Sequence, residues 1–140
     1  MKFFFDGSFP KRLCLAIRIL EQGNPGVEIV FKHDKFAPSV DDTVWIAGLA
    51  GEGDWVVITM DPEILRKPHE RAAWDEAGLT GFFLDGTWGN LRIDETSWRF
   101  LRWWPIIKAT AGAMQPGSTF VVPSRHGRRL VPIGTRRSRS

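Results

Sequence analysis

The chain has 140 residues, of which 43% are hydrophobic and 25% charged, so it is expected to fold as one globular domain and not to be disordered. The single cysteine, Cys14, excludes a disulfide framework or a cysteine zinc site within one chain, and no apolar run is long enough for a signal peptide or a membrane span. A cytoplasmic protein is therefore predicted. All 16 acidic residues fall within residues 1–95, whereas nine of the 19 Lys and Arg lie beyond residue 95.

Apolar and β-branched segments alternate along the chain with segments of helical periodicity. Ser8 and Pro10 provide start signals for the first helix, Asp41 and Asp42 do so for the second, and Pro105 is expected to kink or divide the last one. In chain order, the predicted elements are a strand over 3–5, a helix over 11–22, a strand over 27–31, a helix from Asp42 to about Gly51 or Gly53, a strand over 55–60, a helix over 70–76, a strand over 79–84, a helix region over 95–114, and β-segments over 118–122 and 129–133.

This order of elements favours a parallel sheet, because parallel strands need crossover connections and helices supply them. The predicted fold class is α/β, a three-layer α/β/α sandwich with a mainly parallel central sheet. The last two β-segments predict a C-terminal β-hairpin. One domain is expected over residues 1–133, followed by a basic, disordered tail over residues 134–140.

Aspartates follow the predicted strands. Asp6, Asp61 and Asp85 come directly after strands, while Asp41 and Asp42 begin the helix that follows the second strand. Because the carboxyl ends of parallel strands meet at one edge of the sheet, these five carboxylates are placed at the same edge. Each also fits a local role in a turn or a helix cap, and that reading stays open.

A group of converging carboxylates repels itself unless a cation or raised pKa values relieve the repulsion. Oxygen ligands without a Cys or His framework favour Mg²⁺ or Mn²⁺, whose natural substrates are phosphate esters. Thr59, two residues before Asp61, is a supporting candidate that can hydrogen-bond a carboxylate or a water at this edge. His33, His69 and His126 share no metal-binding spacing.

Four segments resemble the PIN-domain ribonucleases, in particular the toxins of VapBC-type toxin-antitoxin modules. Residues 3–6 resemble their opening strand with its first acid, and residues 42–46 resemble the helix that supplies the second acid. Residues 54–64 and 67–73 combine a strand, an acid and a Pro-x-Glu helix in the order found in that group. The resemblance extends over nearly the full chain, to about residue 133.

The resemblance implies a metal-dependent endoribonuclease in which water attacks an RNA phosphodiester with Mg²⁺ or Mn²⁺ bound. Asp6, Asp42 and Asp61 match the catalytic and metal-binding acids; Asp42 is preferred to the supporting residue Asp41 because of its distance from Trp45. Glu70 and Asp85 compete for the fourth position, Glu70 as a catalytic acid and Asp85 as a metal ligand. The implied partners are RNA, a cognate antitoxin and a second copy of the chain.

Basic and aromatic residues in the last third of the chain are candidates for RNA contacts. Arg125, Arg128 and Arg129 lie on the predicted hairpin and can track phosphates. Trp98, Trp103 and Trp104 lie among arginines and can stack on bases, although burial against the sheet is favoured for most of them.

Two rival functions are retained. A catalytically inactive PIN-like module that binds RNA or protein contradicts little in the sequence. A receiver-like regulator also has aspartates at strand ends, but it is disfavoured because Asp6-Gly7 replaces the expected acidic pair after the first strand.

Overall fold

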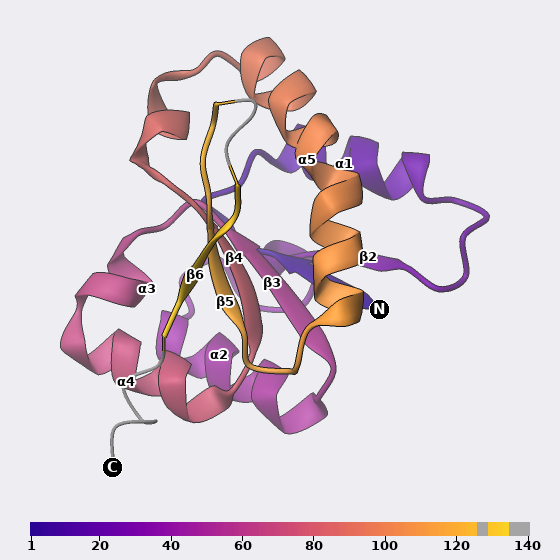
Figure 1. Ribbon diagram of the computed structural model, residues 1–140. Coiled ribbons are helices and arrows are strands. Elements are labelled where there is room, and N and C mark those ends of the chain that lie inside the picture. Colours follow the sequence, from indigo (N-terminus) through magenta and orange to yellow (C-terminus); the bar gives the residue numbers. More distant parts are fainter. Residues whose placement is uncertain (126–128, 135–140) are drawn as a thin grey trace.

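The computed structural model describes residues 1–125 and 129–134. Its centre is one six-stranded sheet with the strand order β2-β1-β3-β4-β5-β6 (Figure 1). The strands are β1 (Lys2–Phe5), β2 (Glu28–Phe31), β3 (Trp55–Thr59), β4 (Thr80–Leu84), β5 (Thr119–Val122) and β6 (Val131–Ile133). β1 to β5 pair in parallel, and β6 runs antiparallel to β5. The predicted hairpin is therefore confirmed.

Helices cover both faces of the sheet, which confirms the three-layer α/β/α fold (Figure 1). One face carries α1 (Lys11–Leu20) and α5 (Ile93–Ala113); the other carries α2 (Asp42–Glu52), α3 (Glu63–Arg66) and α4 (Pro68–Ala77). Two short 3₁₀ helices, η1 (Lys32–Asp34) and η2 (Gly86–Asn90), follow β2 and β4. No helix in the described ranges is long and apolar enough to cross a membrane.

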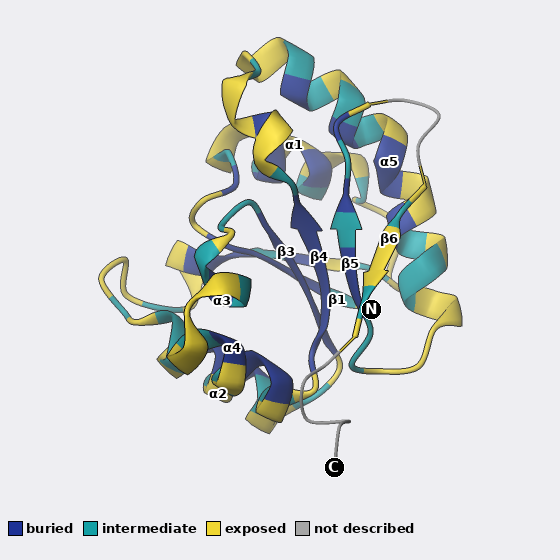
Figure 2. Ribbon diagram, turned by 60° about the vertical axis from the view of Figure 1, so that its left-hand side comes forward, coloured by how far each residue is buried: buried dark blue, intermediate teal, exposed yellow. Residues whose placement is uncertain are grey.

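The core is divided between the two faces of the sheet. All residues of β3 and β4 are buried (Figure 2). Their alternate side chains pack toward α1 and α5 or toward α2 and α4. Gly81 in β4 has no side chain because the ring of Trp74 occupies the space where a Cβ would lie. The tight packing of α4 on the sheet depends on that glycine, and α4 carries the candidate site residue Glu70.

The edge strand β6 contains a proline. Pro132 stands opposite Phe120 of β5 in the antiparallel register. Proline cannot donate a backbone hydrogen bond, so it is tolerated at the edge of a sheet and not in the middle. This position fits the place of β6 at the end of the strand order.

Three expectations about the helices need correction. α5 is a single helix with Pro105 inside it, not two, because Phe100, Trp104 and Ile107 on both sides of the proline are buried in the same core. α1 ends at Leu20, two residues earlier than expected. Asp41 occupies the position before α2, but its side chain makes no capping bond to any residue that the structure describes.

The three tryptophans of α5 differ in exposure, and most of them are buried, as the sequence predicted. Trp103 and Trp104 are buried, as expected for packing against the sheet, whereas Trp98 remains 45% exposed. The indole N–H of Trp98 donates to Glu95, and the guanidinium of Arg99 lies over its ring. Only Trp98 therefore presents an accessible ring among these three.

Candidate active site

The carboxylate of Asp6 lies at the carboxyl end of β1 and is held on several sides. Asp6 is only 3% exposed and accepts hydrogen bonds from the Gly7 N–H at 2.7 Å, the Ser8 hydroxyl at 3.0 Å and the Thr59 hydroxyl at 2.9 Å. The backbone N–H of Asp6 donates to Ile58 in β3. The pairing of β1 with β3 therefore places Asp6 beside the residues that follow β3.

Two hydroxyl groups connect the ends of these two strands. The Thr59 hydroxyl also accepts a bond from the Asp61 N–H at 3.0 Å, and the Ser8 hydroxyl accepts one from the Met60 N–H at 3.0 Å. The oxygens of Ser8 and Thr59 are 3.2 Å apart. This network fixes the orientation of Asp6 and the path of the chain toward Asp61.

Ser8 is a site residue that the sequence does not reveal, because its position before Pro10 predicts a start signal for the first helix. Its hydroxyl instead bonds to Asp6, Thr59 and Met60, across the strand ends. Pro10 precedes α1 and supplies a fixed φ for its start, which frees Ser8 for another role. The signal in the sequence is a serine two residues after a strand-end aspartate.

Asp61 follows β3 and is partly buried. One carboxylate oxygen accepts the Glu63 N–H at 2.9 Å, so Asp61 also supports the turn that enters α3. Burial raises the pKa of Asp61 above its usual value; the Glu63 N–H opposes this, and the negative charges of Asp42 and Asp6 add to the rise. Asp61 therefore lies within electrostatic range of both other acids.

Asp42 begins α2 on the face of the sheet that carries α4. Its carboxylate accepts the indole N–H of Trp45 at 2.8 Å, and Trp45 is itself fully buried. The core therefore anchors the first turn of α2 and, with it, the direction of Asp42. Asp41 is exposed.

Glu70, in the first turn of α4, has an unsatisfied buried oxygen. Its Oε2 is enclosed and has no hydrogen-bond partner among the described residues. Burial raises the pKa of Glu70, and the charges of Asp42 and Asp61 raise it further against the lowering effect of Lys67. An enclosed carboxylate oxygen without a donor is costly, so this atom stands out from the satisfied polar groups around it.

Asp85, at the end of β4, is engaged differently. Its carboxylate accepts bonds from the backbone N–H and the hydroxyl of Thr87, and the Thr87 hydroxyl contacts the Ser124 hydroxyl at 2.6 Å. A cleft of about 640 Å³ lies beside this turn, and its lining includes Asp85, Arg125 and Arg129. Arg128, the third predicted RNA-binding residue, falls outside the described residues, as do residues 135–140 of the predicted tail.

The donor set at Asp6, Asp42, Asp61 and Glu70 is chemically suited to a hard divalent cation. All its ligating atoms are carboxylate oxygens, one of them is enclosed and has no donor among the described residues, and two of the four acids have raised pKa values that a cation would relieve. As the side chains lie, no three His, Cys, Asp or Glu residues in the described part of the chain already surround one ion position. Binding would therefore draw these side chains together.

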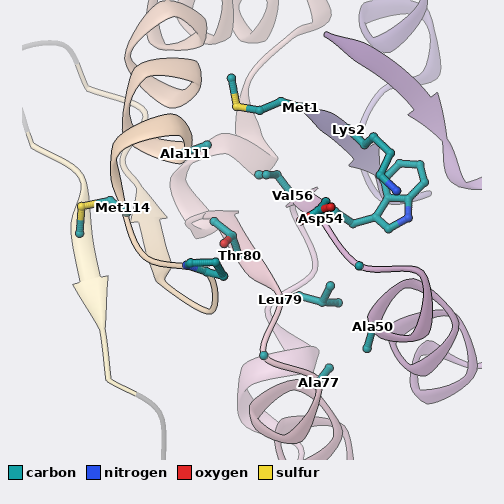
Figure 3. A pocket seen from close by; sticks show the side chains of 14 residues that line it. Met1, Lys2, Ala50, Asp54, Val56, Ala77, Leu79, Thr80, Ala111 and Met114 are labelled. Carbon is teal, nitrogen blue, oxygen red and sulfur yellow. The ribbon is translucent and has the colours of Figure 1, made fainter. Parts of the chain in front are cut away.

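A larger cleft lies at the opposite edge of the sheet. Its volume is about 690 Å³, and it is lined by residues at the amino ends of β1, β3 and β4, including Lys2, Asp54 and Thr80 (Figure 3). Met1, Ala111 and Met114 border it as well. The four acids lie at the carboxyl ends of the strands, so this cleft is separate from the candidate active site.

Comparison with known proteins identifies the family of this fold. A family model described as "PIN like domain" matches residues 1–86, a segment that contains β1 to β4 and all six candidate acids named from the sequence. No curated protein and no solved structure matches the chain. Since the match covers more than half of the 140 residues, the chain belongs to the PIN-like domain family.

Proposed function

We propose that this protein is a metal-dependent endoribonuclease that hydrolyses RNA phosphodiester bonds. The observation that carries the proposal is the raised pKa of Asp61 and of Glu70. Burial is the first cause in both, and neighbouring acids add to it: Asp42 and Asp6 at Asp61, and Asp42 and Asp61 at Glu70. Groups whose pKa values are perturbed by burial and by named charged neighbours are concentrated at functional sites. The family match agrees with a nuclease-type fold.

Asp6, Asp42 and Asp61 are the proposed ligands, with Glu70 as the fourth acid. A bound Mg²⁺ or Mn²⁺ would polarise the phosphate and lower the pKa of a water molecule. Thr59 and Ser8 keep the Asp6 carboxylate oriented through their hydrogen bonds. The Oε2 of Glu70, which has no hydrogen-bond partner among the described residues, is left to accept a hydrogen bond from water or substrate.

The proposed RNA path includes the cleft beside β6. Arg125 and Arg129 border that cleft and offer guanidinium groups to backbone phosphates. Asp85 belongs to the same cleft and is bonded to Thr87, so its proposed role is to support this surface, with Glu70 preferred as the fourth acid.

We further propose that the enzyme is the toxin of a VapBC-type pair in the cytoplasm. The support is the likeness of residues 54–64 and 67–73 to that group, together with the family match. A cognate antitoxin that covers the acidic edge and a homodimeric assembly follow from the same likeness. The domain is proposed to extend over residues 1–133, because β6 completes the sheet at Ile133.

The test is cleavage of a mixed RNA pool by purified protein in Mg²⁺, Mn²⁺ or EDTA. Wild-type protein is expected to cut only with a divalent metal, and Asp6→Asn and Asp61→Asn are expected to abolish cutting while remaining folded. Asp54→Asn is the matched control, because Asp54 precedes β3 whereas Asp61 follows it. Asn also tolerates the positive φ of 65° at residue 54.

The outcomes separate an enzyme from a binding protein. Metal-dependent cutting that needs Asp6 and Asp61 but not Asp54 supports the nuclease. No cutting by clean wild-type protein, together with metal binding that the substitutions leave unchanged, would reject the catalytic centre.

The second candidate is a catalytically inactive PIN-like module that binds RNA or protein. The observation in its favour is that, within the described residues, the acids do not already surround a single ion position. It predicts RNA or partner binding that is insensitive to Asp61→Asn. Calorimetric titration of Mn²⁺ into wild-type protein separates the two candidates, because only the nuclease requires a metal site built from these acids.

A further inference from the structure

The residues that follow β2 lie next to the candidate active site. β2 pairs in parallel with β1, and Phe31 is the register partner of Phe5. Lys32 and Asp6 each follow one member of this pair, so both lie at the carboxyl edge of the sheet. A basic side chain is therefore placed one strand away from Asp6 and two strands away from Asp61.

Lys32 has an unusual environment for a lysine. The residue is 7% exposed, and no carboxylate in the described ranges lies within ion-pair distance of its ammonium group. Its Nζ has no hydrogen-bond partner among the described residues and is not an enclosed atom, so the tip is the part of the side chain that reaches solvent. A stem buried along the protein with an accessible, unpaired charge is available for an anionic ligand.

The loop after β1 packs directly against this basic segment. A Cβ built on Gly7 would lie 3.8 Å from Lys32 Cδ and 3.1 Å from His33 Nε2. The N–H of the same glycine donates to the carboxylate of Asp6. The absence of a side chain at residue 7 thus lets Lys32 and His33 approach the turn that holds Asp6.

We propose that Lys32, with His33 beside it, binds a backbone phosphate of the RNA strand next to the scissile bond; this inference rests on the proposed nuclease function. The acids at this edge repel a polyanion, and an adjacent lysine offsets that repulsion as a compact point charge. The imidazole of His33 packs edge-on against Phe31 with its centroid 5.0 Å away, which limits where its ring can donate. In this role Lys32 contacts the phosphate backbone and does not read the base sequence.

The test is equilibrium binding of a fluorescent single-stranded RNA in EDTA, where no cleavage interferes. Lys32→Met keeps the packed stem and removes the charge; it is expected to weaken binding about fivefold to tenfold. Between about 50 mM and 200 mM salt, it should also reduce the slope of log K against log salt by about 0.7, as one lost phosphate contact on a single strand requires. Lys32→Arg is expected to restore both values.

The matched control is Lys2→Met, which removes the same charge from the opposite edge of the sheet, where Lys2 lies over Trp55. Thermal unfolding of each variant checks that the fold is intact. If Lys32→Met binds RNA with the affinity and salt slope of Lys2→Met, or if wild-type protein binds no RNA, the inference is wrong. If Lys32→Met weakens binding in a protein that does not cleave, the phosphate contact stands and the nuclease proposal fails separately.

Discussion

Carboxylates in two regions of this molecule differ in how fully hydrogen-bond donors satisfy them: Glu21 at the end of α1, and the acids at the carboxyl edge of the sheet. Glu21, at the end of α1, accepts bonds from the Trp104 indole at 2.8 Å, from Lys108 at 2.8 Å and from Asn24 at 3.0 Å. Burial acts to raise the pKa of Glu21, but these donors outweigh it and hold the pKa below its usual value. At the carboxyl edge, burial and neighbouring acids raise the pKa of Asp61 and Glu70.

The difference separates a structural carboxylate from a candidate functional one. Glu21 joins α1 to α5 and is stabilised in its charged form by the helix it contacts. Glu70 has an enclosed oxygen with no donor among the described residues and sits among like charges. Carboxylates whose pKa is raised by burial and by like charges are concentrated at functional sites.

After the loss of Asp6 or Asp61, the largest effect is expected from Glu70→Gln, which removes a charge that the fold disfavours. Cleavage should fall about 100-fold or more, in the range that single charge-stabilising groups contribute. A carboxyl whose pKa is raised by folding destabilises the folded state once it ionises, so the thermal midpoint at neutral pH should rise. Initial cleavage rates and thermal unfolding measure the two effects.

Glu28→Gln, at an exposed position of the edge strand β2, is the control for this change and should alter neither quantity strongly. A variant at Glu70 that unfolds at a lower temperature and still cleaves would place Glu70 with Glu21, among the structural carboxylates.

A smaller effect is expected from Ser8→Ala. The substitution removes the hydroxyl that bonds Asp6 and accepts the Met60 N–H, while Thr59 still holds Asp6. Groups that orient a metal ligand typically change metal affinity or activity 10- to 100-fold, and the remaining Thr59 bond places the expected loss near about 10-fold. Cleavage at varied Mn²⁺ concentration, with Ser118→Ala as control, shows whether the loss lies in metal affinity.

Glu21→Gln should have the opposite profile to Glu70→Gln. Losing charge-assisted bonds to Lys108 and Trp104 should lower the free energy of unfolding by about 1–2 kcal/mol and leave cleavage unchanged. Because folding lowers the pKa of Glu21, its contribution is present above its ordinary pKa and is lost as pH falls through the lowered value. Denaturant unfolding at pH 7 and at about pH 3 should show the difference from wild type shrinking in acid.

The smallest expected effect is a pH-dependent thermal shift by metal. Mn²⁺ at about ten times its Kd should raise the thermal midpoint at pH 7 by about 4 °C. The raised pKa values of Asp61 and Glu70 let protons compete with the metal, so the shift should be smaller at about pH 5. Equal shifts at both pH values would show that the metal binds elsewhere.

The convergence of Asp6 and Asp61 was predictable because both follow strands, and neighbouring parallel strands end at one edge. The sequence did not show whether Glu70 or Asp85 is the fourth acid, because the direction of each side chain depends on the local structure that follows the strand. Asp85 bonds to Thr87 two residues later, whereas Glu70 responds to the charge of Asp42 from another helix. Local sequence contains neither fact.

Lys32 shows the same limit for a basic residue. A lysine after a strand is ordinarily solvated, and nothing around it in the sequence indicates burial. Its environment is set by Gly7, which is distant in sequence and becomes a neighbour only when β2 pairs with β1.

The proline in β6 restricts how a partner protein can dock. An edge strand invites a further strand through its free N–H and C=O groups, and this is one common mode of peptide recognition. Pro132, the middle residue of the three in β6, has no N–H to offer. Strand addition at this end of the sheet is therefore disfavoured, which also protects the edge against self-association. A partner protein that extends the sheet would therefore have to add its strand at the other edge, along β2 and beside Lys32.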